Sequence, residues 1–566
     1  MSLNLVRITA APVPVSATQH LIPMRDGVRL ATDVYLPADA SPTATVLVRL
    51  PYDKDSRYVF FEAAARRFTN RGYAVVVQDV RGKFRSEGPT LAFVFEAPDG
   101  YDTIEWIVAQ PWSNGVVGMF GDSYYGFTQW AAVSSAHPAL KAIVPRVTTA
   151  DLAGAPPQDG PVGEVEWLTT ADYLCRNWLD HDRYELDLDW RIRPIRDIVE
   201  SAYQELGRRS ATLDFVIPES ETDDDGSAVS IYGDRHPFGG PAIPVLHTVG
   251  WFDNLAIASM RDFIALRGKP AWSEVQYLTA DSVDHENYFL AHAPITEDND
   301  HDINDEALER LLDSYTGPAL EFFDVFLQGS QSPDTLPRVR WHLGHEGYHE
   351  SPSWPPPGAC QRNLYLTALG DARDAGGRLV PDPPSDTQTI EWVHDPEQLV
   401  PSAVVDSFSF LHDYPDEAAT ARRADVVSFT AAAADESLDL AGPVDLWIAV
   451  TSTGPSTDLF AKLLDLAPDG TAHMIVRGQG HLTAVDHPKL VRIELGHTGY
   501  RLRPGHRLRL HLASSDYPEF LPNPGTTENR WLATDTRTTT QRLTTDLQTR
   551  PYLSITTLEA DRAGNR

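Results

Sequence analysis

The chain has 566 residues, of which 42% are hydrophobic and 22% charged. This is an ordinary globular composition, and the length exceeds what one hydrophobic core holds, so we expect several domains. The formal net charge of -33 repels phosphate, which excludes nucleic acids and anionic membranes as expected partners. The two cysteines, Cys175 and Cys360, lie far apart without CxxC spacing, which excludes a disulfide framework or thiolate metal site.

The first 18 residues contain no basic segment followed by an apolar run, as a signal peptide would require. No apolar run in the sequence reaches the ~18 residues that a membrane-spanning helix needs. These two features predict a cytoplasmic protein without a membrane partner.

The N-terminal part of the chain alternates predicted strands and helices. Strands are predicted within 21–50, where Asp26-Gly27 signals a hairpin and 44–50 is rich in β-branched residues. The elements that follow are expected at 58–69 (helix), 73–77 (strand), 102–109 (helix), 116–120 (strand), 126–135 (helix) and 142–144 (strand). This order is typical of βαβ units and a mostly parallel sheet.

The pattern then changes twice along the chain. Residues 149–242 carry helical patches among Pro, Asp and Trp, which predicts a helical insertion, and the α/β pattern returns at 243–352 with a helix at 304–327. After the Pro-rich stretch SPSWPPPGA (351–359), residues 353–566 contain short alternating strands separated by turns. This last part is predicted to form an antiparallel sandwich or jelly roll.

A candidate nucleophile lies in the segment from Gly121 to Gly126, GDSYYG, between a predicted strand and a predicted helix. A serine nucleophile needs this tight strand-to-helix turn, because the turn exposes its Oγ. Ser123 is therefore the predicted nucleophile, and the amide of Tyr124 is expected to point at the oxyanion. The alternative is that Ser123 only caps the helix of an ordinary βα turn.

A serine nucleophile requires a histidine base and an orienting carboxylate, each at the end of a later strand. The segment PAIPVLHTVGWFDN ends at Asp253, and EVQYLTADSVDHEN contains His285. Both positions satisfy the chain order Ser, acid, His. His292 and His301 remain rival bases, whereas Asp281 and Asp284 are weaker candidates than Asp253 for the acid.

Several stretches between 22 and 524 give the chain a family resemblance. They are IPMRDGVRLATDVYLP, VLVRLPYDK, QDVRGKFRSEG, WSNGVVGMFGDSYYGFTQW, GWFDN, SWPPPGA and SSDYPEFLPNP. The chain resembles the cocaine-esterase-like hydrolases, a family that includes α-amino-acid ester hydrolases and Xaa-Pro dipeptidyl-peptidases. The resemblance implies an α/β-hydrolase core (1–148 and 243–352), a helical cap (149–242) and a C-terminal jelly roll (353–566).

The same resemblance implies that the phenol of Tyr52 donates to the oxyanion beside the Tyr124 amide. The sequence taken without this resemblance indicates only an aromatic residue that packs at a strand end. The chain departs from the family where Gly-Pro-Trp-x-His is common, since 281–285 reads DSVDH. It also lacks the acidic pair after the triad aspartate that binds an α-ammonium group, since Asn254 follows Asp253. We therefore expect an uncharged acyl group.

The predicted function is hydrolysis of a small-molecule carboxylic ester through an acyl-enzyme, without cofactor or metal. The aromatic residues Phe252 and Trp167 are candidates for substrate contact. Three alternatives stay open: an amide-cleaving acylase or dipeptidyl-peptidase, acyl transfer to an acceptor other than water, and an inert protein that binds a partner through the jelly roll. A homodimer also stays open.

Overall fold

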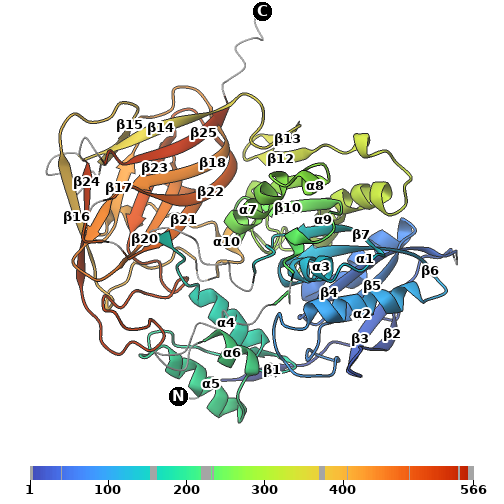
Figure 1. The fold of residues 1–566 in the computed structure, drawn as a ribbon. Coiled ribbons are helices and arrows are strands. Elements are labelled where there is room, and N and C mark those ends of the chain that lie inside the picture. Colours follow the sequence, from blue (N-terminus) through green and yellow to red (C-terminus); the bar gives the residue numbers. More distant parts are fainter. Residues whose placement is uncertain are drawn as a thin grey trace, which may run out of the picture.

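The computed structural model describes residues 4–39, 41–152, 162–217, 231–232, 235–368, 377–404, 406–483, 485–487, 489–545 and 549–558. Figure 1 shows two β-rich bodies side by side, with a group of helices below and between them. The strands of the first body (blue to green, with β12 and β13 in yellow) come from the N-terminal 351 residues, and those of the second (mostly yellow to red) come almost entirely from the rest. Each body is built on a ten-stranded sheet.

The first sheet is mostly parallel. Its strands, in spatial order, are β13 (Gly347–Ser351), β12 (Val339–Leu343), β11 (Gln276–Asp281), β10 (Val245–Gly250), β7 (Leu140–Arg146), β6 (Ser113–Asp122), β4 (Thr43–Leu50), β5 (Ala74–Asp79), β3 (Arg29–Tyr35) and β2 (Thr18–Pro23). The strands from β12 to β5 pair in parallel, and antiparallel pairing occurs only at the edges, between β13 and β12, β3 and β5, and β2 and β3. The carboxyl ends of β6, β7, β10 and β11 therefore meet at one edge of the sheet, where ligands bind in open α/β sheets.

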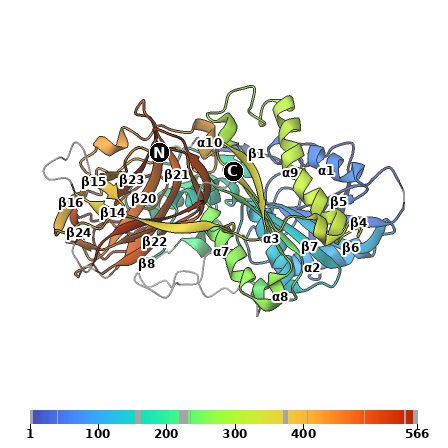
Figure 2. The ribbon, with the colours of Figure 1, turned by 90° about the horizontal axis from the view of Figure 1, so that it is seen from above.

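Helices cover both faces of this sheet, as Figure 2 shows from above. One face carries α1 (Phe61–Asn70) and α9 (Asp305–Phe326); the other carries α2 (Glu96–Val108), α3 (Ser123–Ser135), α7 (Ala256–Arg267) and α8 (Pro270–Ser273). The central strands are buried on both sides, which explains their continuous apolar runs, such as β5 with AVVVQD. This part is an α/β-hydrolase core.

Two helices begin earlier than the sequence predicts. The helix expected at 102–109 begins at Glu96, because Pro98 lies in its first turn, where a missing N–H costs no helical hydrogen bond. The helix expected at 126–135 begins at Ser123 itself. Gly100, just before the first expected helix, is buried in α2, and Gly126, the first residue of the second expected helix, is close-packed inside α3.

The segment after β7 contains helices outside the first sheet. They are α4 (Leu168–Asn177), α5 (Arg196–Leu206) and α6 (Ala211–Val216). The short strand β9 (Arg183–Glu185) of this segment pairs with the N-terminal strand β1 (Val6–Ile8), and β8 (Val162–Gly163) pairs with β21 (Ala472–Leu482) of the second body. The segment is thereby attached to the N-terminal strand and to the second body.

The second body is mostly antiparallel. Its large sheet has the order β22 (Val491–Leu502), β18 (Leu438–Ile448), β25 (Tyr552–Leu558), β14 (Ala359–Thr367), β15 (Gly377–Val380), β17 (Val427–Thr430), β23 (Arg507–Ala513), β20 (Thr457–Leu466), β21 (Ala472–Leu482) and β8, and a small sheet has the order β16 (Gln388–His394), β24 (Thr539–Thr545), β19 (Val450–Ser452). One short helix, α10 (Phe410–Asp413), follows β16 and approaches the first body. Leu463, Leu510 and Ile555 are among the apolar side chains packed in the core of the second body.

The remaining short elements are single 3-10 turns. They are η1 (Arg57–Val59), η2 (Pro237–Gly239), η3 (Leu290–His292), η4 (Pro333–Thr335) and η5 (Thr420–Arg422). Among the described residues, none of the helices combines the length and apolar character needed to cross a bilayer. The acidic stretch PESETDDDGS (218–227), for which a loop is expected, lies outside the described residues.

Candidate active site

Ser123 lies on a sharp turn between β6 and α3. The preceding Asp122 is extended, with φ -97° and ψ 159°, whereas Ser123 has φ 50°, in the left-handed region that side chains other than glycine rarely adopt. Thr148 donates a hydrogen bond to the Ser123 carbonyl oxygen at 2.7 Å. The strained turn is the backbone geometry of a nucleophile elbow.

Two glycines allow this turn to form. A Cβ atom on Gly121 would lie 2.0 Å from Cδ2 of Tyr125, and one on Gly126 would lie 2.4 Å from Cγ2 of Thr148. Gly121 also has φ 141°. The second glycine stands three residues after the serine because the helix packs against Thr148 at that position.

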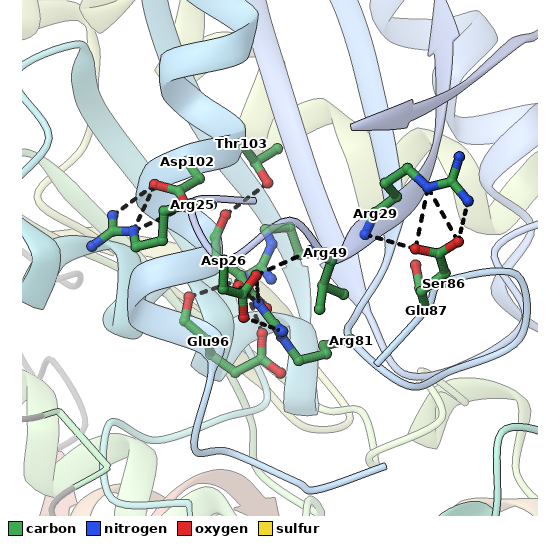
Figure 3. Close-up of polar contacts among 12 residues, drawn as sticks. Arg25, Asp26, Arg29, Arg49, Arg81, Ser86, Glu87, Glu96, Asp102 and Thr103 are labelled. Atoms are coloured by element: carbon green, nitrogen blue, oxygen red, sulfur yellow. Dashed lines mark hydrogen bonds and ion pairs between the residues drawn. The ribbon is translucent and has the colours of Figure 1, made fainter. Parts of the chain in front are cut away.

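The residue after the nucleophile is held by a buried polar chain. The Tyr124 hydroxyl donates to Oε1 of Glu96 at 2.9 Å and accepts from the amide of Phe93. Glu96 in turn forms an ion pair with Arg49 at 2.9 Å (Figure 3). Because Tyr124 is the second residue of α3, its amide lies in the first helical turn, where it has no intrahelical acceptor. That amide is available to an anion.

The loop that precedes Glu96 is held by a second set of ion pairs, also drawn in Figure 3. Arg81 donates to both oxygens of Asp99, at 2.9 and 2.6 Å, and to Asp26 at 2.7 Å. Arg81 and Asp99 are buried. Arg81 thus braces the loop 81–88 through its bonds to Asp26 and Asp99.

His285 and Asp253 form a buried pair. The Nδ1 atom of His285 lies 2.8 Å from Oδ1 of Asp253, and the two side chains are 7% and 0% exposed. Asp253 follows β10, and His285 follows β11, the neighbouring strand. The backbone joins the two loops, since the amide of Phe252 donates to the carbonyl of Val283 at 3.0 Å.

The environment of His285 favours its protonated form. Burial by itself lowers the pKa of His285, but the charge of Asp253, the hydrogen bond to it and the charges of Glu286 and Asp122 outweigh burial and raise the pKa to about 9. A base that gains stability on protonation suits proton abstraction from a hydroxyl group.

The rival residues lie in other environments. His292 is exposed in η3, and Nε2 of His301 lies 3.7 Å from Asp302. Asp281 accepts a hydrogen bond from the Tyr348 hydroxyl. Asp284 is fully buried and accepts from the amides of Tyr288 and Leu411, at 2.9 and 2.8 Å. The unusual residue before the histidine thus holds the loop in place.

Tyr52 lies beside Ser123, the candidate nucleophile. Its hydroxyl interacts with the side chains of Ser123 and Tyr173, and burial raises the pKa of Tyr52 well above its ordinary value. The phenol therefore stays protonated and keeps a proton to donate. The geometry brings together the Tyr52 hydroxyl and the start of α3, the two donors expected at the oxyanion.

Aromatic rings surround this point, and sequence reasoning missed most of them. Tyr52 packs edge-on against Tyr58 and Tyr173, with ring centroids 5.8 and 6.3 Å away. Phe408, from the second body, lies 5.0 Å from the His285 ring. The Tyr58 hydroxyl donates to Oε1 of Glu286 at 2.9 Å, and burial raises the pKa of Glu286 to about 7. No motif signals Tyr58 or Phe408, because neither belongs to the strand ends.

The two candidates for substrate contact, Phe252 and Trp167, line one cavity of about 110 Å³ that also includes Asp253. The described residues that line it include neither Ser123 nor His285. The Phe252 ring stacks on the Phe410 ring with 6.4 Å between centroids, and the ring centroids of Trp167 and Phe520 are 4.2 Å apart. Both rings thus pack against the second body, and contact with a substrate stays a prediction.

Comparison with known proteins identifies the family. A family model described as X-Pro dipeptidyl-peptidase (S15 family) matches residues 26–287, and one described as the X-Pro dipeptidyl-peptidase C-terminal non-catalytic domain matches 332–554. The cocaine esterase of Rhodococcus sp. (strain MB1 Bresler) is 31% identical over 559 residues, covering 90% of this chain and 92% of that protein. The chain belongs to the cocaine-esterase-like family of serine hydrolases. As a member, it is a carboxylic ester hydrolase.

Solved structures of similar fold span the whole chain. An α-amino acid ester hydrolase superposes with a TM-score of 0.76 at 23% identity, covering 97% of this chain and 98% of its own. An aminopeptidase from a marine sediment archaeon (Thaumarchaeota archaeon) gives 0.75 at 23% identity, covering 98% and 99%. These similarities concern the fold of this esterase family and confirm its α/β-hydrolase core.

Proposed function

We propose that the protein hydrolyses carboxylic esters through an acyl-enzyme on Ser123, with His285 as base and Asp253 as orienting acid. The observation that carries the proposal is the buried 2.8 Å contact between His285 and Asp253 at strand ends next to the strained Ser123 turn. Asp253 accepts from Nδ1, which leaves Nε2 of the neutral imidazole as the proton acceptor.

In the first half-reaction, the Ser123 oxygen forms a bond to the acyl carbon while Nε2 of His285 takes the hydroxyl proton. The Tyr124 amide and the Tyr52 hydroxyl donate to the oxyanion that develops on the carbonyl oxygen. The bond to the leaving alkoxide then breaks, and His285 returns the proton to it. In the second half-reaction, water attacks the acyl carbon, loses its proton to His285, and Ser123 is released as the hydroxyl.

The site favours an uncharged, ring-bearing acyl group. Tyr58, Tyr173 and Phe408 provide apolar ring surface around Tyr52 and His285. The residue after Asp253 is Asn254, so that position offers no carboxylate to an α-ammonium group. We extend the same proposal to Phe252 and Trp167 as distal contacts of a long substrate.

Amide cleavage is the second candidate, since the matching family model is described as an X-Pro dipeptidyl-peptidase. Comparing turnover of an ester with its matched amide, with and without an α-ammonium group, separates the two. A preference for the charged dipeptidyl amide would favour the peptidase.

The finer architecture belongs to the same proposal. We infer that 149–242 acts as a cap, since its helix α4 contributes Tyr173 to the ring cluster. The antiparallel order of the second body supports a jelly roll over 353–566. The core would then comprise 1–148 and 243–352.

A fluorophosphonate probe tests the nucleophile. Labelled protein is digested, and mass spectrometry locates the modified residue. We expect labelling at Ser123 that Ser123→Ala abolishes, while Ser135→Ala, at the far end of the same helix, retains it. Folded wild-type protein that stays unlabelled, or a label on another serine, would contradict the proposal.

A further inference from the structure

For the proposed proton transfer, His285 has to reach Ser123 across several strands of the sheet. Ser123 follows β6 and His285 follows β11, and the order β11-β10-β7-β6 places three strand spacings between them. At about 4.8 Å for each spacing, the two strand ends lie roughly 14 Å apart. The loop after β11 must therefore extend across β10 and β7 and be held there.

A buried polar bridge spans this same gap. The amide nitrogen Nδ2 of Asn287 donates to Oδ2 of Asp122 at 3.0 Å, and Nη2 of Arg146 donates to Oδ1 of Asn287 at 2.8 Å. Nε of Arg146 donates to Oδ1 of Asp122 at 2.9 Å, which closes the triangle. Arg146 is the last residue of β7, the strand between β6 and β10.

Every member of the bridge is buried and satisfied. The exposed fractions of Asp122, Arg146 and Asn287 are 4%, 6% and 5%. The Tyr315 hydroxyl also donates to Asp122 at 3.1 Å, and the Arg146 guanidinium lies 4.4 Å above the Tyr315 ring. A buried ion pair whose hydrogen bonds are all made is stable in a single arrangement of its side chains. It therefore fixes the position of the ends of β6 and β7 and of the loop that carries Asn287.

The bridge joins the two reacting groups through their neighbours in sequence. Asp122 precedes the nucleophile by one residue, and Asn287 follows the base by two. Asn287 has φ 67°, a left-handed conformation that asparagine tolerates better than most residues. Its side chain, rather than its backbone alone, thus ties the histidine loop to the nucleophile's strand.

We propose that Asp122, Arg146 and Asn287 are positioning residues that hold the His285 loop at the distance at which His285 reaches Ser123. The inference rests on the proposed function and adds to it three residues that touch no substrate. Its central residue is Asn287, which, among the residues that the structure describes, alone hydrogen-bonds the histidine loop to the pair formed by Asp122 and Arg146.

The test substitutes Asn287→Gly, which removes the amide without straining a residue at φ 67°. A displacement of about 1 Å in a reacting group costs roughly 100-fold in rate. We expect kcat, counted per site titrated with fluorophosphonate, to fall about ten- to hundredfold, with KM within twofold of wild type. Labelling by the probe should slow by a similar factor.

Two further variants complete the experiment. Arg146→Lys keeps the charge next to Asp122 but loses the forked donor, so we expect a smaller loss in the same direction. The double variant should lose little beyond Asn287→Gly alone, since both remove one bridge. Tyr348→Phe is the control, because the Tyr348 hydroxyl donates to Asp281, which lies outside the bridge; its kcat per site should stay within threefold of wild type.

The outcomes separate the two proposals. If wild-type protein is not labelled at Ser123, the proposed function fails. If wild type is labelled and Asn287→Gly retains wild-type kcat per site, only the positioning role is overturned. If Asn287→Gly does not fold, Arg146→Lys decides: wild-type kcat per site in that variant overturns the bridge, and a loss with unchanged KM supports it.

Discussion

Replacing Asp253 with asparagine isolates the effect of one buried charge on the base. The pKa of His285 stands at about 9 against an ordinary value of 6.5, and Asp253 is the largest of the causes that raise it. That difference corresponds to roughly 3 kcal/mol of preference for the imidazolium. Because the imidazolium forms as the serine proton is transferred, most of this preference acts in the transition state.

The charge alone therefore predicts a loss of about 10²-fold in kcat/KM for Asp253→Asn. Asparagine also donates to Nδ1 and so holds the imidazole in the wrong tautomer, which extends the loss toward about 10⁴-fold. The pH dependence changes as well. In wild type, the base must be neutral, so kcat/KM rises with pH along an acidic limb that levels off near pH 9. In the variant, burial dominates and the limb moves below 6.5.

The assay is hydrolysis of a p-nitrophenyl ester from pH 5 to 10, with titrated active sites. Asp281→Asn is the matched control, since Asp281 ends the neighbouring strand β11 and its contacts are to Ser282 and Tyr348. It should keep kcat/KM within a few-fold of wild type. The reasoning is refuted if Asp253→Asn stays within fivefold of wild type, if its acidic limb does not move, or if Asp281→Asn loses as much.

The other predictions concern single contacts. Tyr52→Phe removes one oxyanion donor and should lower kcat about 10²- to 10³-fold with little change in KM. Steady-state kinetics test this, and a change confined to KM would contradict it. Glu286→Gln should move the acidic limb of kcat/KM to lower pH, because the charge of Glu286 raises the pKa of His285; an unmoved limb refutes it. Burial raises the pKa of Asp262 to about 8, so the folded state keeps a proton that the unfolded state loses, and the contribution of Asp262 to stability falls by about 1.4 kcal/mol per pH unit from pH 5 toward 8. Asp262→Asn should flatten that slope in urea unfolding, and equal slopes would contradict the assignment.

The strand ends were predictable from the sequence because the α/β pattern fixes where functional side chains emerge. Each apolar run that ends in a polar residue marks the carboxyl edge of the sheet, which is how Ser123, Asp253 and His285 are selected as candidates. The structure brings Asp253 and His285 within 2.8 Å, although 32 residues separate them. Strand order and topology suffice for this step.

Side-chain networks between distant segments were not predictable. Asp122 and Asn287 are 165 residues apart, and neither has a motif of its own; Asp122 reads as the variable position of the elbow. The onset of α2 was missed because Pro98 and Gly100 look like loop, yet Pro98 lies in the first turn and Gly100 fits a buried face. Such fits depend on tertiary packing, which local patterns do not contain.

The second body takes part in the candidate site rather than only adjoining it. The amide of Leu411 donates to buried Asp284 at 2.8 Å, and the amide of Glu286 donates to the Phe408 carbonyl at 3.2 Å, so residues on both sides of His285 are bonded to the segment around α10. The histidine loop is thus held from the C-terminal body on one side and, through Asn287, from the nucleophile's strand on the other. A loop fixed at both sides keeps its histidine in position without the Gly-Pro-Trp sequence common in the family. The C-terminal body, although its family model is described as non-catalytic, therefore supplies part of the support on which the geometry of the base depends.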